Sequence, residues 1–262
     1  MIKLKSAEQI EQMKVAGALS KTALRRVGAM VRPGVSTFEL DQLAEQIIRM
    51  HGGTPAFKGY GGFPGTVCAS VNEAVVHGIP NPDVILRDGD VISIDTGAIV
   101  DGWVGDNAWT FFCGTPSPEV RTLCEITRDC LKAGIEAAVP GNRIGDIGHA
   151  VQQLAESNGY GVLRDYVGHG VGRAMHEEPN VPNYGKPGRG VRLEPGMVIA
   201  IEPMITLGSP RVEVGSDGWI VTTRDHQPAA HYENTIAITL DGPVILTADD
   251  QGPWCSMEGG AL

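Results

Sequence analysis

The sequence repeats part of itself, and this internal repeat constrains the fold more than any other feature. Pro33-Gly34 recurs 107 positions later as Pro140-Gly141. At the same offset, the segment DGDVISID at 88–95 matches PGMVIAIE at 195–202. Two amphipathic helices can align by chance, but a helix block and a strand block that share one offset indicate a duplicated unit. We therefore expect two related halves, at about 6–115 and 116–246.

Each half is expected to begin with two helices. Capping signals and the Pro-Gly and Gly stops give their bounds. The expected helices run from Ser6 to before Arg32, from Ser36 to before Gly52, from Ser117 to before Pro140, and over 144–158. Runs of β-branched and apolar residues predict strands at 67–71, 91–98, 103–112, 197–206, 219–223 and 232–239. This pattern is typical of an α+β fold in which helices back an antiparallel sheet.

Composition excludes some classes of function. The chain has 262 residues and a formal net charge of −10, which argues against a protein that binds nucleic acid through a broad basic surface. Its five cysteines form no C-x-x-C pair and favour reduced thiols. The N-terminus lacks the apolar stretch of a signal peptide, and no run is long enough to span a membrane. We expect a cytoplasmic protein.

Two aspartates interrupt the most apolar pair of strands. Asp101-Gly102 predicts a type I′ turn, which would pair Gly97 with Asp106. Side chains alternate along a strand, so Asp95 shares a face with Gly97 and lies diagonal to Asp106, about 7–8 Å away by backbone. The missing side chain of Gly97 is expected to leave room above Asp106. Two converging carboxylates need a counter-charge or a shared proton.

The repeat adds a third acid, because Glu202 falls on the strand position equivalent to Asp95; a fourth, Glu233, lies in another predicted strand. Each acid taken alone is more readily explained as a turn or edge residue facing water. A shared proton could satisfy two acids but hardly four. A carboxylate-rich set suits Mn²⁺, Fe²⁺, Co²⁺ or Zn²⁺, and a pair of such ions is a recurrent hydrolytic centre.

Three histidines and one cysteine are further candidates. His169 lies between two glycines that would let an imidazole and a ligand approach closely. His176 follows in the same segment, and His77 ends an apolar strand. Cys68 is expected to be core or pocket lining. An isolated histidine is by default a structural residue with its hydrogen bonds satisfied, or a surface residue. We apply this default to the remaining four: His51, His149, His226 and His231.

The order and spacing of these residues resemble the type I methionine aminopeptidase family. The motifs are NEAVVHGIP, GHGVGRAMHEEPNVP, IAIEPM and HYENTIAI, and the resemblance extends from about Ser6 to Leu246. It implies the pita-bread fold, with two pseudo-symmetric halves whose helices back a central curved antiparallel sheet. In the compact bacterial form of the family, 1–250 would be a single catalytic metallopeptidase domain and 251–262 a C-terminal tail.

The resemblance also implies roles for individual residues. Two divalent metals, with cobalt or manganese serving in vitro, would be held by Asp95, Asp106, His169, Glu202 and Glu233. Asp106 and Glu233 would bridge the metals, and Glu202 would be the general base. His77 and His176 would contact the substrate, and the methionine pocket would be lined by Tyr60, Phe63, Cys68 and Trp219. The chain departs from the bacterial pattern at three positions. A smaller residue is usual in place of Phe57, a tyrosine in place of Phe63, and an aromatic residue in place of Met175.

The implied activity is removal of the initiator methionine from nascent polypeptides whose second residue is small. The implied partners are nascent N-termini and the ribosome, and the chain would act as a monomer without nucleic acid or membrane. Two alternatives remain. One is an Xaa-Pro aminopeptidase or dipeptidase on the same fold, which usually carries an extra N-terminal domain. The other is a metal-free binding protein of this fold, which would have lost some of the five ligands.

Overall fold

A computed structural model describes residues 1–259, so the last three residues of the expected tail 251–262 lie outside the described part. Within it, the four expected helices are present. Their bounds are α1 Ala7–Gly28, α2 Thr37–Met50, α3 Pro118–Ala137 and α4 Ile144–Ser157. Capping boxes open α1 at Ser6 and α2 at Ser36, as the sequence predicts. A short 3-10 turn, η1, covers Tyr60–Gly62.

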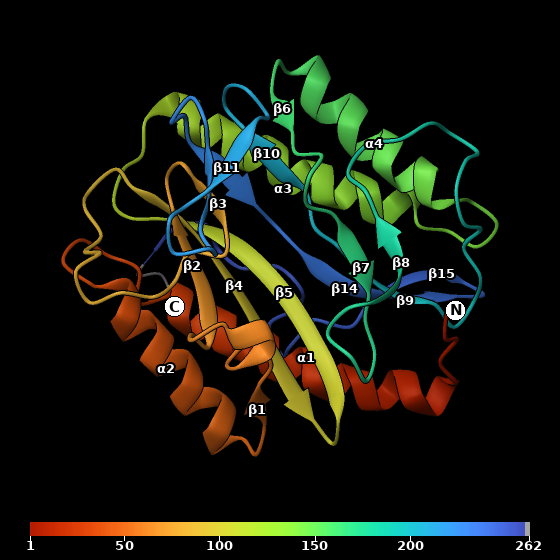
Figure 1. Ribbon diagram of the computed structural model, residues 1–262. Helices are drawn as coiled ribbons and strands as arrows, with labels where there is room; N and C mark the ends of the chain where they lie inside the picture. Colours follow the sequence, from red (N-terminus) through yellow and green to blue (C-terminus); the bar gives the residue numbers. More distant parts are fainter. Residues whose placement is uncertain (260–262) are drawn as a thin grey trace.

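The internal repeat is visible in the backbone. Helices α2 and α4 begin at Thr37 and Ile144, which are equivalent positions of the repeat. The glycines that precede them have matching left-handed angles, with φ of 90° at Gly34 and 93° at Gly141. In Figure 1 the pair α1 and α2 lies on one side of the strands, and α3 and α4 lie on the other. The expected α+β architecture of two helix-backed halves is confirmed.

Each half supplies one larger antiparallel sheet. The first has the order β1-β4-β2, with β5 also paired to β4; its strands are β1 Thr54–Pro55, β2 Val67–Val71, β4 Val91–Val100 and β5 Trp103–Phe112. The second has the order β15-β14-β9-β7-β8; its strands are β7 Gly168–Gly170, β8 Glu177–Val181, β9 Val198–Ile201, β14 Asn234–Thr239 and β15 Gly242–Ile245.

Two three-stranded sheets complete the arrangement. One has the order β13-β10-β6, with β13 Ala229–His231, β10 Met204–Thr206 and β6 Gly161–Val162. The other has the order β11-β12-β3, with β11 Val212–Val214, β12 Val221–Thr223 and β3 Ala74–Val76. No helix in residues 1–259 combines the length and the apolar composition that crossing a membrane requires.

The sequence-based strand bounds are nearly correct for the three predicted strands of the first half and partly wrong in the second. Strand β4 extends to Val100, beyond the predicted end at 98, and the short strands β1 and β3 were not predicted. Strands β2 and β5 have the predicted ends. The expected continuous strand 197–206 is instead two strands, β9 and β10, in different sheets, with Glu202-Pro203 between them. Proline has no N–H for a ladder, which explains an interruption at this point. Glu233 likewise lies in the gap between β13 and β14.

Helix α1 packs directly on the hairpin β4–β5. A Cβ on Gly105 would clash with the backbone of Gly17, so Gly105 allows backbone-to-backbone contact between β5 and α1. The Ser20 hydroxyl lies 2.7 Å from the carbonyl oxygen of Thr96 and 2.8 Å from the side-chain oxygen of Asn107. These two residues directly follow Asp95 and Asp106. The helix therefore fixes, from behind, the two strands that present the aspartates.

Candidate metal centre

The hairpin β4–β5 brings Asp95 and Asp106 onto one face in the predicted register. Gly97 pairs with Asp106, and Asp101 and Gly102 form the turn with φ of 49° and 75°. Contrary to the expectation from the sequence, the space beside Gly97 is not open. A Cβ there would lie 2.8 Å from Ala56 and 3.0 Å from the ring of Phe57, so pocket-lining side chains fill it.

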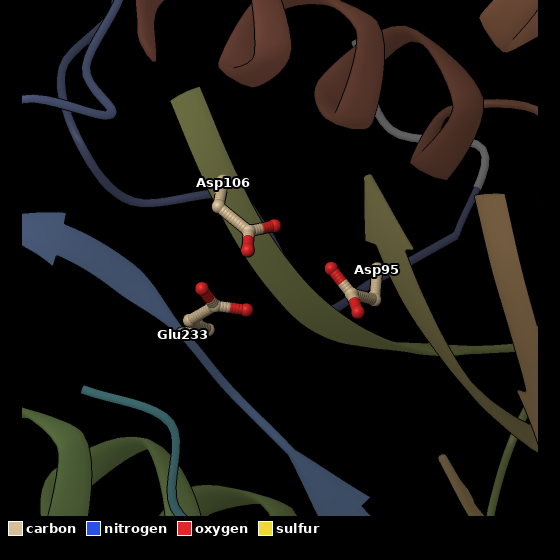
Figure 2. A group of neighbouring side chains, drawn as sticks. All are labelled: Asp95, Asp106 and Glu233. Carbon is tan, nitrogen blue, oxygen red and sulfur yellow. The ribbon is translucent and has the colours of Figure 1, made fainter. Parts of the chain in front are cut away.

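Three carboxylates meet in front of this hairpin. Each of Asp95, Asp106 and Glu233 offers one oxygen, and these oxygens all lie within 4.8 Å of one another. Figure 2 shows the three side chains facing a common space, with Glu233 opposite the two aspartates. Within residues 1–259, one buried oxygen of each has no hydrogen-bond partner. Such a set is costly without a counter-charge.

Burial raises the pKa of all four acids of the site, as expected for carboxyl groups removed from water. Desolvation, opposed by hydrogen bonds from Asp106 and Thr96, raises the pKa of Asp95 to about 7. Desolvation and the neighbouring carboxylates raise the pKa of Asp106 and Glu233 well above the usual range. The same two causes, with Asp95 as the neighbour, raise the pKa of Glu202. In the described residues no lysine or arginine lies within 4.0 Å of these acids, so a bound cation is the missing partner.

His169 completes the set of five predicted ligands. Its Nε2 lies 3.6 Å from Asp106 Oδ2 and 3.6 Å from Glu202 Oε1. Its Nδ1 lies 2.9 Å from the Gly170 carbonyl oxygen, so Nδ1–H donates there and the Nε2 lone pair faces the acids. Desolvation and the neighbouring His176 lower the pKa of His169 to about 4, which keeps the ring neutral and able to bind a metal.

The glycines beside His169 have a different purpose from the expected one. A Cβ on Gly168 or Gly170 would clash with the carbonyl oxygens of Ala200 or Glu178 on neighbouring chain segments. They therefore allow close strand packing rather than access for a ligand. The five predicted ligands do meet at one place, and four carboxylates with one imidazole suit a first-row divalent ion. That they bind metal stays a prediction from geometry.

A cavity of about 230 Å³ opens beside these residues. Every residue predicted to contact the substrate lines it, namely Tyr60, Phe63, Cys68, His77, His176 and Trp219. The Phe63 and Trp219 rings meet edge to face at 5.2 Å. All three departures from the bacterial pattern, Phe57, Phe63 and Met175, lie in the wall. Burial, with Asp95 and Asp106 nearby, raises the pKa of Cys68, so this residue is a neutral wall rather than a nucleophile.

Five residues of this cavity were not predicted from the sequence, and two of them, His231 and Tyr166, carry rings that could contact a ligand. His231 was expected to be a satisfied structural or surface residue, but its ring is buried in the cavity wall and its Nε2 has no partner among residues 1–259. The alternation of side chains along an extended segment could have revealed it. His231 is two positions before Glu233, so the two side chains are expected on the same face. Tyr166, whose ring meets His77 edge to face at 5.4 Å, carries no comparable local signal.

Comparison with known proteins gives a consistent result. The sequence model of metallopeptidase family M24 matches residues 11–240. The chain is 51% identical to a methionine aminopeptidase of Clostridium acetobutylicum, over 94% of this chain and 99% of that protein. A crystal structure of a Thermotoga maritima methionine aminopeptidase superposes with a TM-score of 0.93 at 45% identity, over 94% of this chain and 99% of that chain.

A second kind of peptidase shares the fold. The prolidase from Pyrococcus furiosus matches with a TM-score of 0.77 at 25% identity. The match covers 94% of this chain but 66% of the prolidase chain. The expected pita-bread architecture is thus confirmed by both groups of structures.

Proposed function

This chain belongs to metallopeptidase family M24, and we propose that it is a methionine aminopeptidase, which hydrolyses the peptide bond after an N-terminal methionine. The observation that carries this proposal is the carboxylate cluster of Asp95, Asp106 and Glu233 at the wall of a small, largely apolar cavity. The whole-length identity to methionine aminopeptidases supports the choice of substrate.

The family implies divalent metal, and the residues of this chain fit it. Unpartnered buried oxygens and a neutral imidazole that faces them form a donor set for cations. We propose two ions, of Mn, Fe, Co or Zn, held by Asp95, Asp106, His169, Glu202 and Glu233, with Asp106 and Glu233 shared. When bound, such ions offset the carboxylate charge and polarise a peptide carbonyl.

The chain's own side chains supply the proton transfers and the orientation. We propose that Glu202, whose pKa burial raises, accepts a proton from the attacking water and passes it towards the leaving amine. His176 would donate a hydrogen bond to the carbonyl oxygen, and His77 would orient the scissile amide. Both histidines line the cavity beside the carboxylates, which supports these roles.

The cavity accounts for an apolar first residue. A space of about 230 Å³ between Phe63, Cys68 and Trp219 has room for a single side chain. The thioether of methionine makes favourable contacts with aromatic rings, which Phe57, Phe63 and Trp219 provide. We propose a small second residue because the family resemblance implies it.

The biological setting remains a proposal. We infer that the substrates are nascent polypeptide N-termini, that the protein is cytoplasmic and monomeric, and that the ribosome is a further partner.

Peptide hydrolysis with and without metal tests the proposal. Purified protein loaded with Mn²⁺ or Co²⁺ should release methionine from Met-Ala-Ser, and the chelated protein should not. Methionine release from a peptide with a bulky second residue should be much slower. Cleavage of an Xaa-Pro peptide without methionine release would instead favour the prolidase type of activity, and absence of metal binding would favour a binding protein.

A further inference from the structure

His231 is a buried histidine whose ring has no assigned purpose. It is the last residue of β13, and it is 2% exposed. Thr110 on β5 fixes its backbone twice, because the His231 N–H donates to Thr110 Oγ1 at 3.0 Å and Thr110 Oγ1 donates to the His231 carbonyl oxygen at 2.9 Å. The backbone therefore cannot shift to give the ring another partner.

The ring nitrogen Nε2 of His231 faces the carboxylates. It lies 3.8 Å from Glu202 Oε2 and 4.0 Å from Glu233 Oε2. His169 approaches the other oxygen of Glu202, with its Nε2 3.6 Å from Oε1. The Glu202 carboxylate thus lies between two imidazoles, one on each of its oxygens.

The two candidate partners of His231 differ in their other contacts. Glu233 belongs to the group of three acids whose oxygens lie within 4.8 Å, and it is proposed to be shared by both ions. Glu202 lies outside that group and is the nearer one to His231. Its backbone carbonyl accepts a hydrogen bond from Asn183 Nδ2 at 2.9 Å, which fixes the main chain, so the orientation of the carboxylate depends on the contacts of the side chain itself.

We propose that His231 is a positioning residue for Glu202. Its Nε2–H donates a hydrogen bond to Glu202 Oε2 and orients this carboxylate to accept a proton from water. A donor that lies 3.8 Å away needs less than 1 Å of side-chain motion to form this bond, and buried polar atoms are normally paired. The inference rests on the proposed function, because it assumes that Glu202 acts as the base.

Two substitutions of His231 separate this role from a structural one. In His231→Gln the side-chain amide nitrogen reaches near the position of Nε2, whereas in His231→Asn it reaches only near Nδ1. We expect the Gln variant to keep kcat within about threefold of the unmodified protein. The Asn variant should lose about 10- to 100-fold in kcat, the usual effect of removing a partner that orients a site residue. KM should change less than about twofold in both, because the methionine pocket is untouched.

Controls and further measurements distinguish the other outcomes. His149→Gln and His149→Asn change a histidine on α4 outside the cavity and should leave kcat unchanged. Metal affinity, measured by calorimetry, should be unchanged in the Gln variant and should fall by at most about 10- to 100-fold in the Asn variant, because Glu202 is also a proposed metal ligand. Should the Asn variant fail to fold, His231→Met, which lacks a donor, replaces it.

Several results would overturn the positioning role. Equal kcat in the Gln and Asn variants would show that no donor is needed at Nε2. Loss of metal binding in the Gln variant as well as in the Asn variant would make His231 a metal ligand instead. Failure of the proposed function is recognised separately, because the unmodified metal-loaded protein would then not release methionine from Met-Ala-Ser.

Discussion

The direction in which His176 can donate depends on the position of one proton. Its Nδ1 lies 2.9 Å from the Tyr60 hydroxyl oxygen, and the two rings stack with centroids 5.4 Å apart. Desolvation lowers the pKa of His176, so the ring is neutral at pH 7. A neutral ring that accepts from the tyrosine hydroxyl at Nδ1 carries its proton on Nε2. Tyr60 would then make His176 a donor towards the substrate, not only line the pocket.

We predict that Tyr60→Phe lowers kcat about tenfold and changes KM by less than about twofold, the size of effect that loss of an orienting partner produces. Steady-state kinetics on Met-Ala-Ser gives both values. Tyr184→Phe is the matched control, because this ring stacks on Arg164 outside the cavity and should have no effect. A Tyr60→Phe variant with unchanged kcat would show that the hydrogen bond does not set the tautomer.

Asp106 is predicted to be indispensable for activity. It is 2% exposed and lies within reach of both His169 and the other acids of the cluster. Asp106→Asn should lower kcat at least about a hundredfold, since it removes a shared ligand rather than an orienting partner. Metal stoichiometry by elemental analysis should fall as well. Full metal content with full activity in this variant would exclude Asp106 from the centre.

At the scale of elements, the contact of α1 with β5 permits a stability prediction. Gly105→Ala would force a methyl group into the backbone of Gly17 and should cost about 1–3 kcal/mol of unfolding free energy. Activity should fall with it, because Gly105 directly precedes Asp106. Urea unfolding followed by circular dichroism measures the cost. The control Val15→Ala, at a residue of α1 that is 57% exposed, should change little, and equal effects would contradict direct packing.

The same scale shows what the sequence could predict. The hairpin β4–β5 was predictable residue by residue, because an Asp-Gly turn fixes the register and alternation fixes the faces. Helix bounds followed from caps and stops that act within a few residues. The break at Glu202-Pro203 was not recovered, because an apolar run looks the same in one strand or in two that belong to different sheets.

Strands β7 and β8 and the remaining strands of the small sheets were also missed, because their pairing is set by partners far away in the chain; only β10 and β12 of the small sheets lie in predicted strands. The residues of the site also divide into those that the sequence identified and those that it did not. The four acids followed from the hairpin register, the repeat and a predicted strand, and the family resemblance supplied the full ligand set and the pocket residues; these residues meet in space. His231 was instead assigned the default for an isolated histidine.

For the whole molecule, the buried acids predict an unusual dependence of stability on pH when metal is removed. Burial raises the pKa of Asp95 to about 7 and that of the three other acids well above their usual range, so the folded state holds protons that the unfolded chain has released. The unfolding free energy should therefore fall as pH rises, by about 1.4 kcal/mol per pH unit for each such proton. The lowered pKa values of His169 and His231 act in the opposite direction, but only below about pH 6.5.

The measurement is a comparison of thermal melts between pH 7 and 8 in chelator. Lys21, whose pKa burial lowers, opposes the trend, but it is present in both the unmodified protein and the Asp106→Asn variant. The difference between the two slopes therefore isolates the acid cluster, and the unmodified protein should show the steeper decline. Saturating Mn²⁺ should remove the decline, and identical slopes in chelator would contradict the proposed protonation.

The hairpin that carries Asp95 and Asp106 belongs to the first half of the molecule, whereas His169, Glu202 and Glu233 come from the second. Neither half alone has enough donors to cage two cations. Ions held between the two halves would bind them to each other. If the chain is cleaved in the exposed Gly114-Thr115 connection, the two halves should stay associated with metal bound and separate more readily after the metal is removed. The protein would then gain its activity and the association of its two halves together when the ions bind, and lose both when the ions leave.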